Sequence, residues 1–169
     1  MTTYTGTGVS PDGIAFDGTN MWTTDNVNRS VTKITPTGAT TTYNIGTGSA
    51  PIGIAFDGTN MWTANYGGNS VTKITPTGAT TTYTGTGANP NAIAFDGTNM
   101  WTANNGGASV TKITPTGAMT TFTGTGGAPL DIAFDGTHLW QFGSGYTAGS
   151  MWTANYSSSS VTKVTPSGN

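Results

Sequence analysis

Short runs of β-branched, aromatic and aliphatic residues recur along the chain and are separated by Gly, Pro, Asn and Asp. In residues 54–83, the runs Ile54–Phe56 and Met61–Ala64 are joined through Asp-Gly, and Ser70–Thr75 and Thr80–Tyr83 through Pro-Thr-Gly. The run residues favour strands, and the separating residues favour tight turns. No segment has apolar residues at helical spacing over ten or more positions. The pattern predicts four short antiparallel strands in this stretch.

The same four-strand pattern occurs four times. The units begin at Ile14, Ile54, Ile93 and Ile132, so they are spaced by 40, 39 and 39 residues. A period near 40 residues is typical of propellers and solenoids, and one four-stranded sheet per period describes a propeller blade. We therefore predict an all-β protein, a single β-propeller domain over residues 1–169 with four four-stranded blades.

The two ends of the chain indicate how a propeller would close. The sequence stops after a third strand of the pattern, and its opening residues 2–8 match the fourth-strand segment 81–87. We expect the N-terminal strand to complete the last blade and cover a strand edge that would otherwise be free. The alternative is that the four units form half of an eight-bladed ring shared by two chains. An open solenoid is disfavoured because it would leave half-built units at both ends.

Charge is sparse along the chain, with five basic and seven acidic residues and a net charge of -2. Without clustered Lys or Arg there is no basic surface for phosphates, so we expect no nucleic-acid partner. No apolar run approaches the ~18–20 residues of a membrane span, and the first residues do not resemble a signal peptide. Low charge combined with abundant Thr, Gly, Asn and Ser is common in extracellular and virion proteins. We therefore expect an extracellular or virion-surface location.

Residues suited to catalysis are scarce. The chain has no Cys and no Glu, which excludes disulfides, thiolate metal sites and thiol nucleophiles. His138, expected in an exposed turn, is the only side chain whose ordinary pKa lies near neutrality. A Ser or Thr nucleophile needs a neighbouring base, and His138 is the single candidate. We expect no enzyme activity, no cofactor and no metal ion.

One unit has the residue pattern of a known propeller blade. The matching positions in the second unit are Pro51, Gly53, Ile54, Ala55, Asp57, Asn60, Trp62, Ala64, Asn65, Val71, Lys73, Ile74, Pro76 and Gly78. This pattern resembles the blades of streptogramin (virginiamycin B) lyase-like and NHL/YVTN propellers, and the resemblance covers the whole chain. It implies the fold. The lyases of that family use seven blades and a site with His, Glu and magnesium, so the single His and missing Glu do not match their catalytic machinery.

Three residue types recur once per unit. They are aspartate (Asp17, Asp57, Asp96, Asp135), tryptophan (Trp22, Trp62, Trp101, Trp152, with Trp140 as an extra) and lysine (Lys33, Lys73, Lys112, Lys163). The aspartates suit Asp-Gly turns, and a ring of carboxylates for a divalent cation is the alternative. The tryptophans suit packing between blades, with stacking on sugar rings as the alternative. The lysines are expected to be solvated strand residues.

The units differ from one another in their loops and in an insertion. Antiparallel order places the loops between second and third strands on the same face as the connectors between units, and we expect ligands or partners there. The fourth unit gains residues 141–151, which we interpret as a protruding hairpin that either makes contacts or is a neutral duplication. The candidate contact residues are Tyr66, Asn69, Asn105 and Tyr156 on the loops, with Phe142 and Tyr146 on the insertion.

These observations favour a non-catalytic structural or interaction protein. We expect a propeller that self-associates or joins a larger protein assembly as an extracellular or virion-surface subunit. The alternative is a multivalent, lectin-like module that binds glycans. A lyase-like enzyme would need an acid–base pair that the chain lacks. Asn28 and Asn155 begin glycosylation sequons, which matter only in a host that modifies them.

Overall fold

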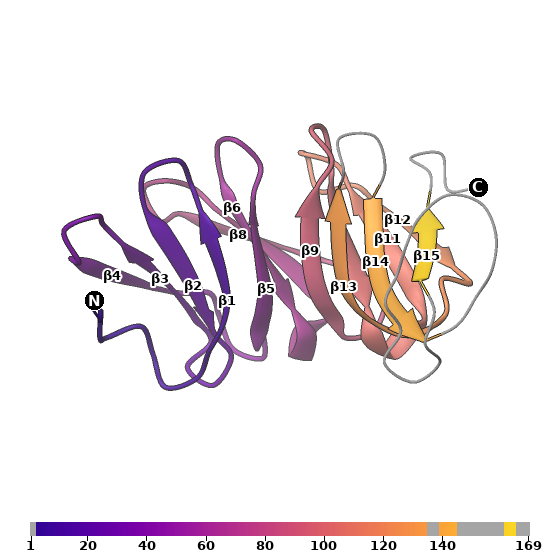
Figure 1. Cartoon of the computed structure of the whole chain (residues 1–169), viewed down its shortest axis with the longest axis horizontal. Coiled ribbons are helices and arrows are strands. Elements are labelled where there is room, and N and C mark those ends of the chain that lie inside the picture. Colours follow the sequence, from indigo (N-terminus) through magenta and orange to yellow (C-terminus); the bar gives the residue numbers. More distant parts are fainter. Residues whose placement is uncertain (1–2, 135–138, 145–160, 165–169) are drawn as a thin grey trace.

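The fold is a succession of antiparallel sheets arranged along an arc (Figure 1). The structure is a computed structural model that describes residues 3–134, 139–144 and 161–164. In every sheet the strands follow sequence order, so each strand pairs with the one before and after it. This arrangement confirms the all-β, propeller-like fold predicted from the repeat.

We number the sheets as blades 1 to 4. Blade 1 contains β1 (Pro11–Phe16), β2 (Met21–Asp25), β3 (Ser30–Ile34) and β4 (Thr40–Asn44). Blade 2 contains β5 (Pro51–Phe56), β6 (Met61–Asn65), β7 (Ser70–Ile74) and β8 (Thr80–Thr84). Blade 3 contains β9 (Pro90–Phe95), β10 (Met100–Asn104), β11 (Ser109–Ile113) and β12 (Met119–Thr123). Blade 4 contains β13 (Gly127–Phe134), β14 (Leu139–Ser144) and β15 (Val161–Val164).

Two single turns of 3-10 helix, η1 (Tyr66–Gly68) and η2 (Asn105–Gly107), join the second and third strands of blades 2 and 3. Among the described residues no helix is long and apolar enough to cross a bilayer. The sequence pattern predicted turns at both places, and the structure adds their 3-10 geometry.

The first strands of the blades, β1, β5, β9 and β13, lie side by side (Figure 1). Each has an irregularity in its pairing near its beginning, as between Pro11 and Ile14 of β1. The approach of neighbouring strands explains a glycine here, because a β-carbon at Gly53 would lie 2.8 Å from the carbonyl oxygen of Asn91. The close spacing brings the broad faces of successive sheets together.

The hydrophobic core lies between these sheets. Trp22 and Val31 of blade 1 pack against Ile54, Met61 and Ile74 of blade 2. The same arrangement recurs between blades 2 and 3, and between blade 3 and Ile132. Blades 1 to 3 therefore each have a tryptophan face toward the following blade, and blades 2 to 4 each have an isoleucine face toward the preceding one. The prediction that Trp22, Trp62 and Trp101 pack between blades is confirmed, since all three are buried.

The predicted single-chain ring is not closed in this structure. Residues 3–10 form no strand, and β1 and β15 lie at opposite ends of the arc (Figure 1). The reason is geometric. The side chains packed between successive sheets set the step from blade to blade, and after these steps blade 4 does not reach blade 1.

The insertion also differs from its prediction at its beginning. Residues 141–144 belong to β14, in which Phe142 pairs with Asp131 of β13 and with Val161 of β15. They therefore form the middle strand of blade 4 instead of starting a protruding hairpin. The physical reason is that the fourth unit contains two candidate second strands, and the first of them pairs with its neighbours. The rest of the insertion, including Tyr146, lies outside the described residues.

Candidate functional site

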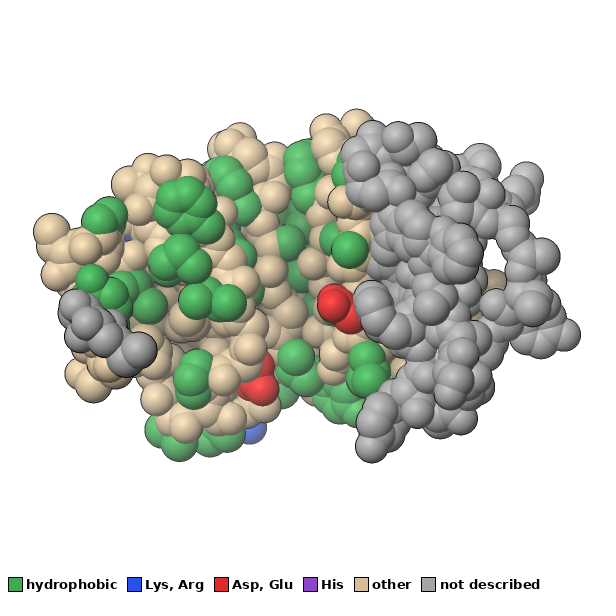
Figure 2. All heavy atoms as spheres, in the orientation of Figure 1, with side chains coloured by type: hydrophobic (Ala, Val, Ile, Leu, Met, Phe, Trp, Pro, Cys, Tyr) green, Lys and Arg blue, Asp and Glu red, His purple; other side chains and the backbone are tan. Residues whose placement is uncertain are grey.

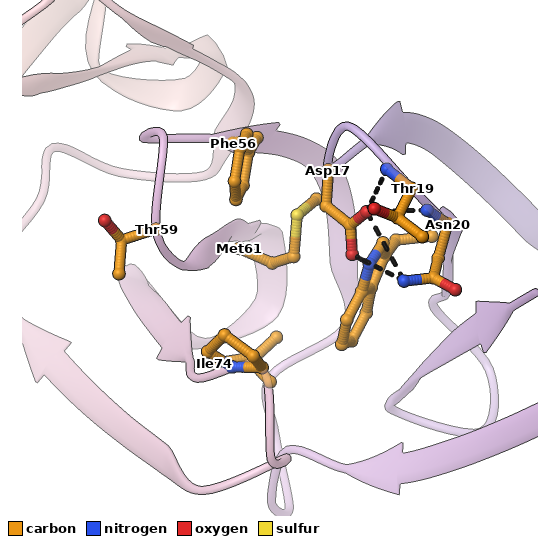
Figure 3. Close-up of a pocket in the computed structure, with 9 residues that line it drawn as sticks. Asp17, Thr19, Asn20, Phe56, Thr59, Met61 and Ile74 are labelled. Carbon is orange, nitrogen blue, oxygen red and sulfur yellow. Dashed lines mark hydrogen bonds between the residues drawn. The ribbon is translucent and has the colours of Figure 1, made fainter.

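The repeated aspartates are held within their own turns. Asp17 accepts hydrogen bonds from the backbone N–H groups of Thr19 at 2.8 Å and Asn20 at 2.6 Å (Figure 3). Its second oxygen accepts from the indole N–H of Trp22 at 2.6 Å. Asp57 and Asp96 have the same partners in blades 2 and 3. The turn interpretation is confirmed for these three aspartates, and Asp135 lies outside the described residues.

These hydrogen bonds also set the protonation of the carboxylates. Partial burial raises the pKa of Asp17, but the hydrogen bonds from Asn20, Trp22 and Thr19 outweigh it and lower the pKa to about 2. The pKa values of Asp57 and Asp96 are lowered by the same balance. In the described part of the chain, no three His, Cys, Asp or Glu residues are grouped as a metal site would require. The carboxylates are charged at neutral pH and act as acceptors that orient the tryptophans.

Each of the three described core tryptophans, Trp22, Trp62 and Trp101, is also covered by other side chains of its own blade. Tyr43 stacks on Trp22 with ring centroids 5.7 Å apart, and the ammonium group of Lys33 lies 5.6 Å from the indole centroid. Trp62 and Trp101 have equivalent partners. Lys33, Lys73 and Lys112 are strand residues, as predicted, but they are half-buried and also lie over aromatic rings. Nothing is described of the side chain of Lys163. Buried in this way, the three tryptophans are not available for stacking on sugars.

The loops and connectors that were predicted to share a face do so. The N–H of Tyr66 donates to the carbonyl of Ala50, and the N–H of Asn105 donates to the carbonyl of Asn89. The side-chain oxygen of Asn69 accepts from the N–H of Asn89 at 2.8 Å. These bonds join the loops between second and third strands of blades 2 and 3 to the connectors beside them, which confirms the predicted arrangement there.

The six predicted contact residues are distributed unevenly. Tyr66 and Asn105 are half-buried, and Asn69 is exposed with a left-handed φ of 46°. Phe142 is placed only by its pairing in β14, and Tyr146 and Tyr156 lie outside the described residues. The structure thus brings Tyr66 and Asn69 together on one loop, with Asn105 on the next. Glycan binding at this face stays a prediction.

Blade 1 departs from its neighbours at Asp25. In blades 2 and 3 the equivalent residues, Asn65 and Asn104, are buried and bond to Ser and Thr side chains. Asp25 instead accepts from the backbone N–H groups of Val9 and Ser10, and from Asn28. Burial raises its pKa, but these hydrogen bonds outweigh the burial and lower it. A buried carboxylate therefore fixes the N-terminal segment, residues 3–8, through the residues that follow it.

The N-terminal segment occupies the place of an outer strand of a preceding blade. The ring of Tyr4 lies against Gly38, as Tyr43 lies against Gly78 and Tyr83 against Gly117. In the last two cases the tyrosine comes from the fourth strand of one blade and the glycine from the next blade. The match to a fourth strand, noted in the sequence, therefore extends to the position of Tyr4 in space.

The isoleucine face of blade 1 contains Ile14, Phe16, Met21 and Ile34, and the end formed by Ile14 and Phe16 lacks the cover that blade 2 has, although Ile34 is buried. Ile14 is 65% exposed and Phe16 is 55% exposed, whereas Ile54 is 8% exposed. Hydrophobic side chains are accordingly visible over the β1–β2 end of the molecule (Figure 2). The sequence alone did not single out this face, because the Ile-Ala-Phe of blade 1 is identical to the buried copies.

Two cavities allow the isoleucine faces of blades 1 and 2 to be compared. Between blades 1 and 2, a cavity of about 260 Å³ has Asp17 and Trp22 on one side and Met61 and Ile74 on the other (Figure 3). On the isoleucine face of blade 1, an apolar hollow of about 310 Å³ is lined by the corresponding residues of one side only. Those residues are Phe16, Thr19, Met21, Ile34 and Pro36, with Ile14, Thr35 and Tyr4. The exposed end of the arc therefore has the form of half an interblade junction.

Comparison with protein families identifies the kind of propeller. The model of the Virginiamycin B lyase family matches residues 5–144, and the chain belongs to this family. No curated protein sequence matches the chain.

Solved structures agree with this assignment. Virginiamycin B lyase from Staphylococcus aureus is 26% identical, with a TM-score of 0.69 over 78% of this chain and 47% of the lyase. A streptogramin B lyase structure is 22% identical, with a TM-score of 0.74 over 92% of this chain and 51% of that one. A chain of a nidogen/laminin complex is 16% identical with a TM-score of 0.66, covering 79% of this chain and 55% of that one, and shows the fold alone. The chain spans about half the length of the lyases that it matches.

Proposed function

We propose that this member of the virginiamycin B lyase family is a non-catalytic propeller subunit that self-associates through the isoleucine face of blade 1. The observation that carries the proposal is the 65% exposure of Ile14, at a position where Ile54 is 8% exposed. Contiguous apolar surface of this kind marks sites of protein interaction. Its hollow has the outline of a junction between blades, so the partner that fits is another blade.

The partner we assign is a second copy of the chain. Each copy has an isoleucine face at one end of its arc and blade 4 at the other, so two copies can join head to tail. Such contacts close into a ring when the rotation permits. Two chains of four blades would make the eight-bladed ring that the sequence left open beside the four-bladed one.

The non-catalytic part of the proposal rests on the residues available. The chain has one His and no Glu, and the carboxylates of Asp17, Asp57 and Asp96 are already hydrogen-bonded to indoles and backbone amides. Their lowered pKa values make them poor proton acceptors at neutral pH. A role in positioning the core explains these aspartates fully.

The location we assign to this subunit is an extracellular or virion surface, within a larger protein assembly. Its support is compositional, since the chain combines few charges with abundant Thr and Gly. Immunogold labelling of the native source with an antibody to the chain would test it. Labelling confined to the cell interior would contradict the location while leaving self-association intact.

The test of self-association is the molar mass in solution over a range of concentrations. We expect a wild-type dimer that dissociates on dilution, and a monomer for the double variant Ile14→Thr/Phe16→Thr with an unchanged circular dichroism spectrum. Val27→Thr is the matched control, because Val27 is 58% exposed but does not line the isoleucine-face hollow. A wild-type protein that stays monomeric at all concentrations would overturn the proposal.

A further inference from the structure

Among the described residues, one edge of blade 4 has no strand paired with it. Blades 1 to 3 each have four strands, whereas the described part of blade 4 has β13, β14 and β15. One edge of β15 pairs with β14, and none of the described strands pairs with the other edge. A free edge exposes a row of unpaired backbone groups that readily accept another strand.

The pairing of β15 also shows which position in a blade it holds. Thr162 pairs with Gln141 of the middle strand, as Thr32 pairs with Thr23 and Thr72 with Thr63. β15 is therefore the third strand of blade 4, and the strand that blade 4 lacks in the described residues is its fourth.

The N-terminal segment has the features of that fourth strand. Residues 2–8, which contain this segment, are identical in sequence to residues 81–87, which include most of β8. Tyr4 already contacts Gly38 in the way that fourth-strand tyrosines contact the glycine of the following blade. Asp25 holds the end of the segment in place through the N–H groups of Val9 and Ser10. The segment thus lies against blade 1 in the position that the fourth strand of a preceding blade would take, although it belongs to none of the described sheets.

We propose that residues 3–8 of one copy form the fourth strand of blade 4 in a second copy, beside β15. This inference rests on the proposed self-association and specifies its geometry. Strand addition to a sheet edge provides backbone hydrogen bonds, and it would place the isoleucine face of blade 1 against blade 4 of the partner. A single contact would then cover both the isoleucine face of blade 1 and the edge of β15 that no described strand pairs with.

The repeat specifies the register of the added strand. Tyr43 pairs with Val31, Tyr83 with Val71 and Phe122 with Val110 in blades 1 to 3. The corresponding pairs in the two-chain blade are Tyr4 with Val161, and Thr3 with Thr162. In the complete blades the threonine pair is hydrogen-bonded between hydroxyl oxygens 2.9–3.0 Å apart. In the repeat, the positions of Thr3 and Thr162 correspond to this threonine pair.

Disulfide trapping tests this register, because the chain contains no cysteine. The single variants Thr3→Cys and Thr162→Cys are purified reduced, mixed and mildly oxidised, so that any link between them joins separate chains. We expect at least about tenfold more linked dimer from this mixture than from Thr3→Cys mixed with Thr98→Cys, whose cysteine lies in an exposed turn of blade 3. The double variant Thr32→Cys/Thr42→Cys is the positive control, since these residues pair within blade 1.

The outcomes separate the inference from the proposed function. A wild-type dimer without preferential Thr3–Thr162 linkage would overturn strand addition and leave self-association standing, whereas a wild-type monomer would overturn both. If the double variant Thr3→Cys/Thr162→Cys yields only a link within one chain, closure of a single ring replaces the two-chain blade. Hydrogen exchange in the unmodified protein tests strand addition without substitutions. The backbone amides of residues 161–164 should become protected as the protein concentration rises. Exchange that does not change with concentration would contradict the inference.

Discussion

Blades 1 and 2 carry the same residues at the same strand positions, yet their isoleucine faces have different surroundings. Ile54 packs against Trp22 and Val31 of the preceding blade, whereas the hollow beside Ile14 receives only Tyr4 from outside blade 1 among the described residues. The local sequence and strand pairing are alike in the two blades. The difference teaches that the burial of a residue in this fold depends on the neighbouring blade. Identical units can therefore be core in one place and exposed surface in another.

The largest expected effect tests that comparison directly with one substitution at two equivalent positions. Ile54→Ala should lower the free energy of unfolding by about 2–5 kcal/mol, because it leaves a cavity in a packed junction. Ile14→Ala should lower it by less than about 1 kcal/mol in dilute, monomeric protein, because an exposed side chain has little packing to lose. Urea denaturation of both variants at low concentration measures the two values.

A matched pair of losses would contradict the comparison, since it would mean that Ile14 is buried in the monomer. The measurement is repeated at the higher concentration at which the proposed self-association predicts a wild-type dimer. There the effect of Ile14→Ala should increase, because dissociation becomes part of unfolding.

An intermediate effect concerns the carboxylates that both blades share. Asp17, Asp57 and Asp96 have pKa values in the folded protein that lie below the ordinary value of 3.8. Their stabilisation is complete above the unfolded-state pKa and is lost as pH falls through the folded-state pKa, which for Asp17 is about 2. The melting temperature should therefore be constant from pH 7 to about pH 5 and fall steadily between about pH 4 and pH 2.

Asp57→Asn provides the control for this pH dependence. It should lower the free energy of unfolding at pH 7 by about 1–3 kcal/mol, because the amide is a weaker acceptor for the indole and backbone N–H groups. The variant should also lose less stability than wild type between pH 4 and pH 2. A wild-type melting temperature that is unchanged down to pH 2 would show that these hydrogen bonds do not favour the charged carboxylate.

The smallest expected effect concerns the lysines that lie over tryptophans. Lys73→Met keeps most of the aliphatic length and removes the charge that lies 5.5 Å from the indole centroid of Trp62. It should lower the free energy of unfolding by about 0.5–1 kcal/mol. Lys33→Met in blade 1 should have a similar effect, because its tryptophan is covered as in blade 2. A stabilised Lys73→Met variant in urea denaturation would argue that the ammonium contributes nothing there.

Much of this architecture was predictable because it depends on local chemistry. Asp17 is followed by Gly18 and precedes Trp22 by five positions, so a tight turn returns the indole to the carboxylate within one hairpin. The alternation in 70–74 predicts a strand whatever lies beside it. It was also predictable that the loops and connectors share a face, because this follows from the antiparallel order of the strands.

Other features depended on contacts between distant residues. The fourth unit offers two similar second strands, and only pairing with β13 and β15 decided that Leu139–Ser144 takes the position. The docking of Tyr4 on Gly38 likewise joins segments that no local pattern connects.

The amino-acid sequence by itself determined the strands, their turns, the number of units and the side chains that pack between blades. These follow from backbone preferences and hydrophobic alternation, which act over a few residues. Only the tertiary structure decided that Ile54 is core and Ile14 is surface, and that the arc leaves β1 and β15 apart. The rotation between blades arises from packing across each junction, and a sequence of identical units contains no local signal for where that packing begins.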